Sequence, residues 1–183
     1  ENASSGYSPR DTANTIDALS AVGDESGMNG LLYLIEHTRS DVSEKAFQAL
    51  LGRVSETKQL RRILITYIYS LAGEGMHIGD AYRIDSLMSS LRDLVRKNPD
   101  LVNFEMIQAL GDLMVAYMKT IDEKKITTLG TLTGDYPYQY LNIPNALLAT
   151  MIFVSRENRK IGKTARSRRI IQHSALDILS KYI

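Results

Sequence analysis

The chain of 183 residues has no cysteine and no tryptophan, and it has only three histidines. Without cysteine it cannot form disulfides or thiolate metal sites. The histidines fall in three different segments. We expect no His-Glu-x-x-His motif, no histidine paired with a carboxylate four residues away and no His-x-His pattern among them. We therefore expect no metal site, zinc included, and no cofactor.

The sequence also lacks the motifs that indicate a catalytic site and the long apolar run that indicates a transmembrane segment. The chain has no Gly-x-Ser-x-Gly elbow, no phosphate-binding loop ending in Gly-Lys-Ser/Thr and no Gly-x-Gly-x-x-Gly fingerprint. No apolar run approaches the roughly 18–20 residues that span a bilayer. The sequence therefore indicates neither catalytic residues nor a transmembrane segment.

Charge is balanced over the whole chain but divided unevenly along it. Residues 1–155 carry 14 Lys/Arg and 19 Asp/Glu, a formal charge of −5, whereas residues 156–183 carry 8 and 2, a formal charge of +6. A basic end on an acidic body is typical of a polar interaction surface or of a contact for self-association.

Helical periodicity dominates the remainder. Apolar residues recur three and four positions apart, as Ile16, Leu19 and Val22 do, and Asp11 or Thr12 could cap the first helix. We expect helices at about 11–22, 26–38, 41–54, 56–71, 80–97, 101–120, 144–156 and 164–182. Asn98-Pro99-Asp100 should cap the sixth of them, and Gly162-Lys163-Thr164 should separate the last two.

The helical pattern repeats. A shift of 60 residues aligns the Gln-Ala-Leu at 48–50 with the Gln-Ala-Leu at 108–110 and keeps the apolar spacing around both. The aligned apolar pairs are Met28/Met88, Leu31/Leu91, Leu34/Leu94, Ile35/Val95, Val42/Val102 and Phe47/Ile107. Such a period is typical of stacked helix pairs, which share a continuous core.

Residues 16–54 resemble HEAT repeats of the short type. The matching positions are Ala18-Leu19, Gly23-Asp24, Leu31, Leu34, Ile35, Asp41, Val42 and Ala49-Leu50, while Glu25 and Ser43 depart from the family's frequent Pro and Arg. The resemblance is good over 11–54 and weaker over 84–119. It implies an all-α fold, a right-handed α-solenoid of about four antiparallel helix pairs related to the armadillo type; a generic helical bundle is the alternative.

Domain organisation follows from these ranges. We expect residues 1–10 to form a flexible leader and residues 11–183 a single helical-repeat domain, interrupted by a loop insertion at about 121–144. The chain starts with a polar segment and without methionine. We therefore favour an exported or cell-envelope protein over a cytoplasmic one.

Two irregular stretches are the candidate binding sites. The loop contains alternating Tyr136, Tyr138 and Tyr140, and tyrosine is enriched in contact surfaces. The other stretch is the basic segment, which has seven cations within residues 156–169: Arg156, Arg159, Lys160, Lys163, Arg166, Arg168 and Arg169. Both could equally serve the fold, the rings by packing on the helices and the cations as a solvated helix end.

Three functions remain open. The resemblance favours a non-enzymatic scaffold that binds a protein partner, because HEAT-like proteins generally act this way. Binding of nucleic acid through the basic segment, as in HEAT-like DNA glycosylases, is the main alternative, and a HEAT-like lyase is the third. Self-association is also compatible with the split charge.

Overall fold

A computed structural model of the chain describes residues 9–22, 25–38, 41–73, 76–123 and 142–182. Over these residues the regular structure is entirely helical, as the sequence predicts, and contains no strand. The chain divides into two compact units, Glu1–Ser70 and Leu71–Ile183. The expectation of a single domain over 11–183 stays a prediction.

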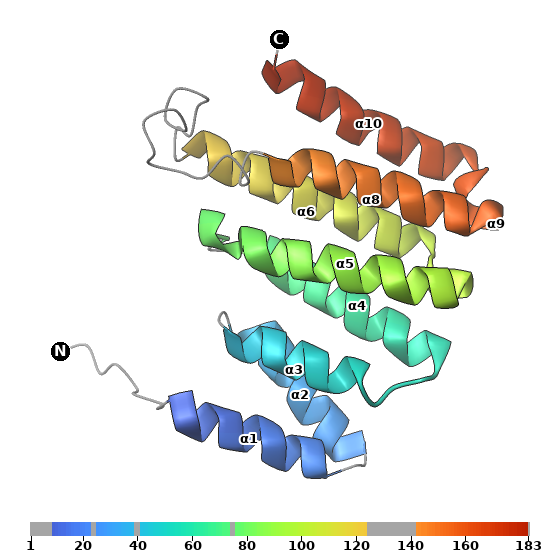
Figure 1. Ribbon diagram of the computed structural model, residues 1–183. Helices are drawn as coiled ribbons and strands as arrows, with labels where there is room; N and C mark the ends of the chain where they lie inside the picture. Colours follow the sequence, from blue (N-terminus) through green and yellow to red (C-terminus); the bar gives the residue numbers. More distant parts are fainter. Residues whose placement is uncertain (1–8, 23–24, 39–40, 74–75, 124–141, 183) are drawn as a thin grey trace. The chain divides into compact units, whose positions relative to one another are not determined.

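The first unit contains α1 (Pro9–Ala21), α2 (Glu25–His37), α3 (Asp41–Leu51) and most of α4 (Thr57–Ala72). Helices α1, α2 and α3 pack on one another (Figure 1). The rings of Phe47 on α3 and Tyr67 on α4 stack, with centroids 4.0 Å apart and planes 15° apart. Both side chains are buried, as is Ile35 of α2, so aromatic stacking joins α4 to the core of this unit.

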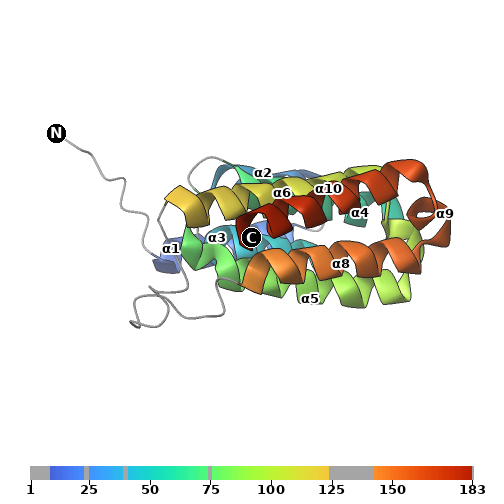
Figure 2. The ribbon, with the colours of Figure 1, turned by 90° about the horizontal axis from the view of Figure 1, so that it is seen from above.

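The second unit contains η1 (Ile78–Asp80), α5 (Ala81–Lys97), η2 (Pro99–Leu101), α6 (Phe104–Glu123), α8 (Ile143–Glu157), α9 (Arg159–Gly162) and α10 (Ala165–Tyr182). Helices α5 and α8 form one layer and α6 and α10 the other (Figure 2). Helix α8 packs against α5, α6, α9 and α10. Its Leu147, Met151 and Val154 are completely buried, so this helix carries the centre of the core.

Polar groups on α8 are also used inside this unit. Arg92 Nη2 on α5 donates to Thr150 Oγ1 at 2.7 Å, and the same hydroxyl donates to the Ala146 carbonyl at 2.8 Å. Thr150 is fully buried, so its hydroxyl is satisfied by both neighbours and links α5 to α8.

Four of the six apolar pairs aligned by the 60-residue shift have the same burial in the two units, whereas Met28 and Val42 are half-buried and their counterparts Met88 and Val102 are buried. Leu31 and Leu91, Ile35 and Val95, and Phe47 and Ile107 are all buried to 1% exposure or less. The helices concerned are α2 and α5, and α3 and α6. At these three pairs, the repeat seen in the sequence corresponds to buried positions on α2 and α5 and on α3 and α6.

Most helix boundaries fall close to the predicted ones, with three differences. Helix α1 begins at Pro9, ahead of Asp11 and Thr12, because proline is accommodated in a first helical turn. Asn98 caps the 3-10 turn η2 rather than α6, its Oδ1 accepting from Asp100 N at 3.2 Å. Asn103 caps α6 instead, its Oδ1 accepting from Met106 N at 2.9 Å.

The third difference is α9, a four-residue helix where the sequence predicts only a break before α10. The tyrosine loop, with Tyr136, Tyr138 and Tyr140, lies outside the described residues. Within the described part of the chain, none of the helices has the length and apolarity needed to cross a membrane.

Gly27 of α2 provides a test of the first unit. A Cβ at this position would lie 2.1 Å from the Val22 carbonyl oxygen and 2.6 Å from the Leu19 carbonyl oxygen, both backbone atoms at the end of α1. We expect Gly27→Ala to lower the free energy of unfolding by about 1–3 kcal/mol, because the added methyl group overpacks the contact between α1 and α2 and forces the two helices apart. The higher helix propensity of alanine offsets only part of this loss. Urea denaturation measures this change.

Gly52→Ala is the matched control. Its Cβ would meet only the carbonyl oxygens of Gln48 and Ala49, at 3.7 and 3.8 Å, which is ordinary contact. Stability should stay within about 0.5 kcal/mol of the wild type. Equal effects of the two substitutions would contradict the close approach of α1 and α2.

Candidate functional site

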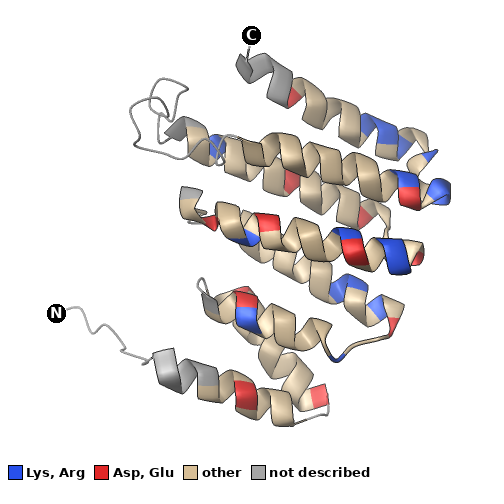
Figure 3. Ribbon diagram, viewed as in Figure 1, with Lys and Arg blue, Asp and Glu red and all other residues tan. Residues whose placement is uncertain are grey.

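The seven cations of the basic segment gather at one end of the second unit (Figure 3). Helix α8 carries Arg156, α9 carries Arg159 and Lys160, the next turn carries Lys163, and α10 carries Arg166, Arg168 and Arg169. All seven side chains are exposed. The structure therefore brings the predicted basic residues into one region, which we call the basic end.

Asn158 holds this region to the rest of the unit. Its Oδ1 accepts from Ile161 N at 3.3 Å and caps α9. Its Nδ2 donates to the carbonyl oxygens of Pro99 and Val102, at 3.0 and 3.1 Å. The side chain is 8% exposed, so one amide joins the α8–α9 turn to the connection between α5 and α6 through buried bonds.

Thr164 begins the last helix. Its Oγ1 accepts from Ser167 N at 3.3 Å and donates to the Ile161 carbonyl at 2.7 Å. The hydroxyl therefore caps α10 and ties it to α9. Two capping residues in seven positions explain why the chain folds back from α8 to α10 within so short a distance.

Gly162 lies directly on the last turn of α8. A Cβ at this position would be 1.9 Å from the Ser155 carbonyl oxygen and 2.7 Å from its carbon, so only glycine fits without moving backbone. Helix α9 therefore packs against α8 more closely than a side chain would permit.

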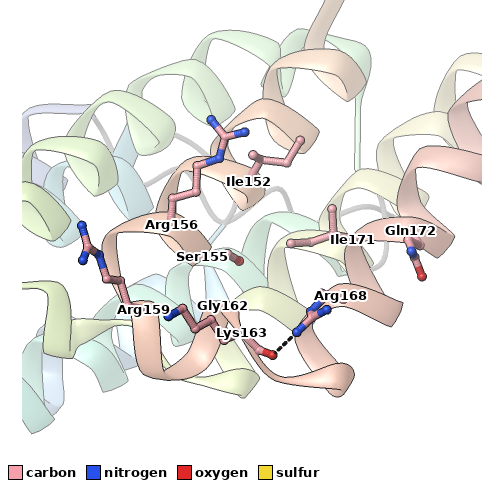
Figure 4. A pocket seen from close by; sticks show the side chains of 9 residues that line it. All are labelled: Ile152, Ser155, Arg156, Arg159, Gly162, Lys163, Arg168, Ile171 and Gln172. Carbon is pink, nitrogen blue, oxygen red and sulfur yellow. Dashed lines mark hydrogen bonds between the residues drawn. The ribbon is translucent and has the colours of Figure 1, made fainter.

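A pocket of about 580 Å³ opens between α8, α9 and α10 (Figure 4). Nine residues line it: Ile152, Ser155, Arg156, Arg159, Gly162, Lys163, Arg168, Ile171 and Gln172. Four of these are cations of the basic segment and none is acidic. The size lies in the range of small-ligand sites. Arg168 Nη2 donates to the Lys163 carbonyl at 2.6 Å and holds the turn at the mouth of the pocket.

Ser155 is the residue at this site that the sequence does not reveal. It is 5% exposed, and its Oγ has no hydrogen-bond partner among the residues that the structure describes. Figure 4 shows the hydroxyl directed toward α10 across the pocket. A buried hydroxyl without a partner is costly, which marks Ser155 as a candidate contact for a ligand.

The remaining cations of α10 lie elsewhere. Arg166 and Arg169 line a second cavity of about 420 Å³ between α6 and α10, and the Arg166 guanidinium lies 5.2 Å from the centroid of the Phe104 ring. Helical geometry places Arg168 nearly opposite Arg166 and about 100° around α10 from Arg169, and Arg168 lines the first pocket. The basic segment thus has two faces, and Arg166 and Arg169 do not share the pocket of Arg156.

The second cavity also contains His173 and Asp177, a histidine and a carboxylate four residues apart on α10. The expectation that no histidine has a carboxylate one helical turn away is therefore wrong at this pair. Among the described residues no group of three or more His, Cys, Asp or Glu could hold a metal ion.

Comparisons with known proteins give no further direction. No family model, no curated protein and no solved structure matches this chain.

Substitution of Asn158 tests how much its three hydrogen bonds stabilise the second unit. Asn158→Ala should lower the free energy of unfolding by about 2–3 kcal/mol, because it removes the cap of α9 and takes a buried donor from the Val102 carbonyl and a second donor from the Pro99 carbonyl. Asn158→Asp keeps the oxygen that caps α9 but cannot donate to the Pro99 and Val102 carbonyl oxygens. We expect it to lower the free energy of unfolding by nearly as much as Asn158→Ala. Thermal or urea unfolding of the full chain measures both.

Asn103→Ala is the control for capping alone. Asn103 caps α6 through Met106 N, and its loss should cost about 1 kcal/mol. An Asn158→Asp variant as stable as the wild type would show that the bonds to Pro99 and Val102 contribute nothing.

Proposed function

We propose that this chain is a non-enzymatic interaction module that binds an acidic protein partner through its basic end. One observation carries the proposal: seven exposed cations lie at one end of the second unit, and within the described parts of the chain none pairs with a carboxylate. The proposal assigns no catalytic residue and no cofactor.

Other arginines of the same unit behave differently. Arg83 Nη1 lies 2.9 Å from Asp80 Oδ1, and Arg96 Nη1 lies 3.5 Å from Asp93 Oδ1. The basic end instead leaves its charge open to solvent. A concentrated field of one sign steers an oppositely charged partner and fixes its orientation, so its most direct use is recognition.

The scaffold of the proposal is a HEAT-like right-handed α-solenoid of about four helix pairs. Support comes from the 60-residue repeat and from equal burial at the aligned positions of α2 and α5, and of α3 and α6. In such a stack, rigid helices hold a binding surface in place, and the surface itself determines the partner.

An acidic protein explains the basic end better than nucleic acid does. Single-stranded nucleic acid is usually bound by basic grooves with open aromatic faces for base stacking. Here the Phe104 ring is covered by Arg166 and the Phe153 ring by Arg96, at 5.2 and 5.3 Å.

Affinity capture with charge-reversed bait tests the proposal. The full chain and the Arg166→Glu/Arg168→Glu/Arg169→Glu variant are used as bait in an extract treated with nuclease, and recovered proteins are quantified. We expect an acidic protein to be retained by the wild type and reduced about tenfold or more by the variant, because buried interfacial charge pairs are worth 2–5 kcal/mol.

Arg53→Glu/Lys58→Glu/Arg62→Glu is the matched control, since it makes the same charge change at three exposed cations of the first unit. Equal loss with both variants, or with neither, would contradict the assignment of the basic end. Salt titration of purified chain with duplex DNA examines the alternative: micromolar binding with a steep salt dependence would replace the protein partner with nucleic acid.

A further inference from the structure

The pocket between α8, α9 and α10 has features that a general basic surface does not need. It is concave, it contains a buried hydroxyl, and its walls include two isoleucines. We propose that this pocket binds the phosphate monoester group of a small soluble organic ligand. The proposal goes beyond protein binding: it uses four of the seven cations of the basic end, whereas Arg166 and Arg169 take no part in the pocket.

The four positive charges of the pocket favour a ligand group with more negative charge than the single charge of a carboxylate. Arg156, Arg159, Lys163 and Arg168 contribute four positive charges, and no Asp or Glu lies among the lining residues. A phosphate monoester carries a charge of about −1.5 to −2 at neutral pH on three acceptor oxygens. Planar guanidinium groups contact such oxygens in pairs, which makes arginine the residue suited to this group.

Ser155 supplies the directional contact. Ser155 lines the pocket, and its buried Oγ has no partner among the described residues, so a rotation about χ1 toward the cavity would let the hydroxyl donate to a ligand oxygen. The Gln172 amide, from the α10 side, can donate as well. A bond to a phosphate oxygen would satisfy a hydroxyl that is otherwise buried without a partner among the described residues.

The size and walls of the pocket indicate the rest of the ligand. A volume of about 580 Å³ exceeds what a phosphate group alone fills. Ile152 and Ile171 are only partly buried and face this space from α8 and α10 (Figure 4). They provide apolar contact for an organic part attached to the phosphate.

Calorimetric titration of the full chain compares three probes: phenyl phosphate, inorganic phosphate and benzoate. We expect saturable one-to-one binding of phenyl phosphate. Inorganic phosphate should bind about tenfold more weakly because it lacks the apolar part, and benzoate more weakly still because it carries a single charge. No saturable binding of phenyl phosphate, or binding of benzoate as tight, would overturn the proposal.

Two charge variants separate a built pocket from nonspecific attraction. Arg156→Gln/Arg159→Gln removes two pocket cations, and Arg166→Gln/Arg169→Gln removes two cations from the other face of the same segment. We expect the first to weaken phenyl phosphate binding about tenfold or more and the second to change it less than about twofold. Equal weakening would show only a diffuse basic field.

Ser155→Ala tests the directional contact without changing charge. Because it removes a buried hydroxyl that has no partner, the melting temperature of the empty protein should stay the same or rise. Binding of phenyl phosphate should nevertheless weaken about three- to tenfold, as for the loss of one hydrogen bond to an anion. Unchanged affinity would contradict the role of Ser155.

A lipid headgroup could present the same phosphate monoester. Flotation with phosphatidylcholine vesicles containing phosphatidic acid distinguishes this source. A soluble ligand is supported when the chain stays unbound and the vesicles do not compete with phenyl phosphate. Co-flotation abolished by Arg156→Gln/Arg159→Gln would overturn the soluble source in favour of the lipid.

Discussion

One amide group anchors the end of the second unit that carries the seven cations. Asn158 accepts the Ile161 N–H in α9 and donates to two carbonyl oxygens of the α5–α6 connection, those of Pro99 and the buried Val102. Backbone segments 56 and 59 residues apart in sequence are thereby joined at one point. The turn that carries the cations consequently has a fixed position on the core rather than that of a free helix end.

This anchoring offsets the repulsion inherent in the basic segment. Seven cations in fourteen residues repel one another, so an isolated peptide of this composition would extend. The caps Asn158 and Thr164 instead fold it into two short-range turns, and the period of α10 then divides its arginines between two faces. The same segment can therefore present two cations on one side and line an open pocket on the other.

The sequence predicts the helices well because core packing imposes a 3.6-residue period that Leu87, Leu91 and Val95 display openly. It does not predict α9 or η2, because both depend on asparagine caps, and Asn158 also bonds carbonyl groups that are distant in the chain. The seven cations were predicted as a candidate site from their clustering within residues 156–169 of the sequence. Their division into two faces, and the burial of Ser155, follow only from how α8, α9 and α10 meet.

Gly162 has a consequence for how this end of the molecule could diverge during evolution. Since no side chain fits between α9 and the Ser155 carbonyl, any substitution of Gly162 would force α8 and α9 apart. The spacing of the two helices therefore cannot change by small steps. The pocket could be retuned only through the groups on its rim, where arginine, lysine and neutral residues exchange without moving backbone. Related chains would then share an invariant glycine and asparagine beneath a variable rim, so that ligand preference drifts while the shape of the cavity persists.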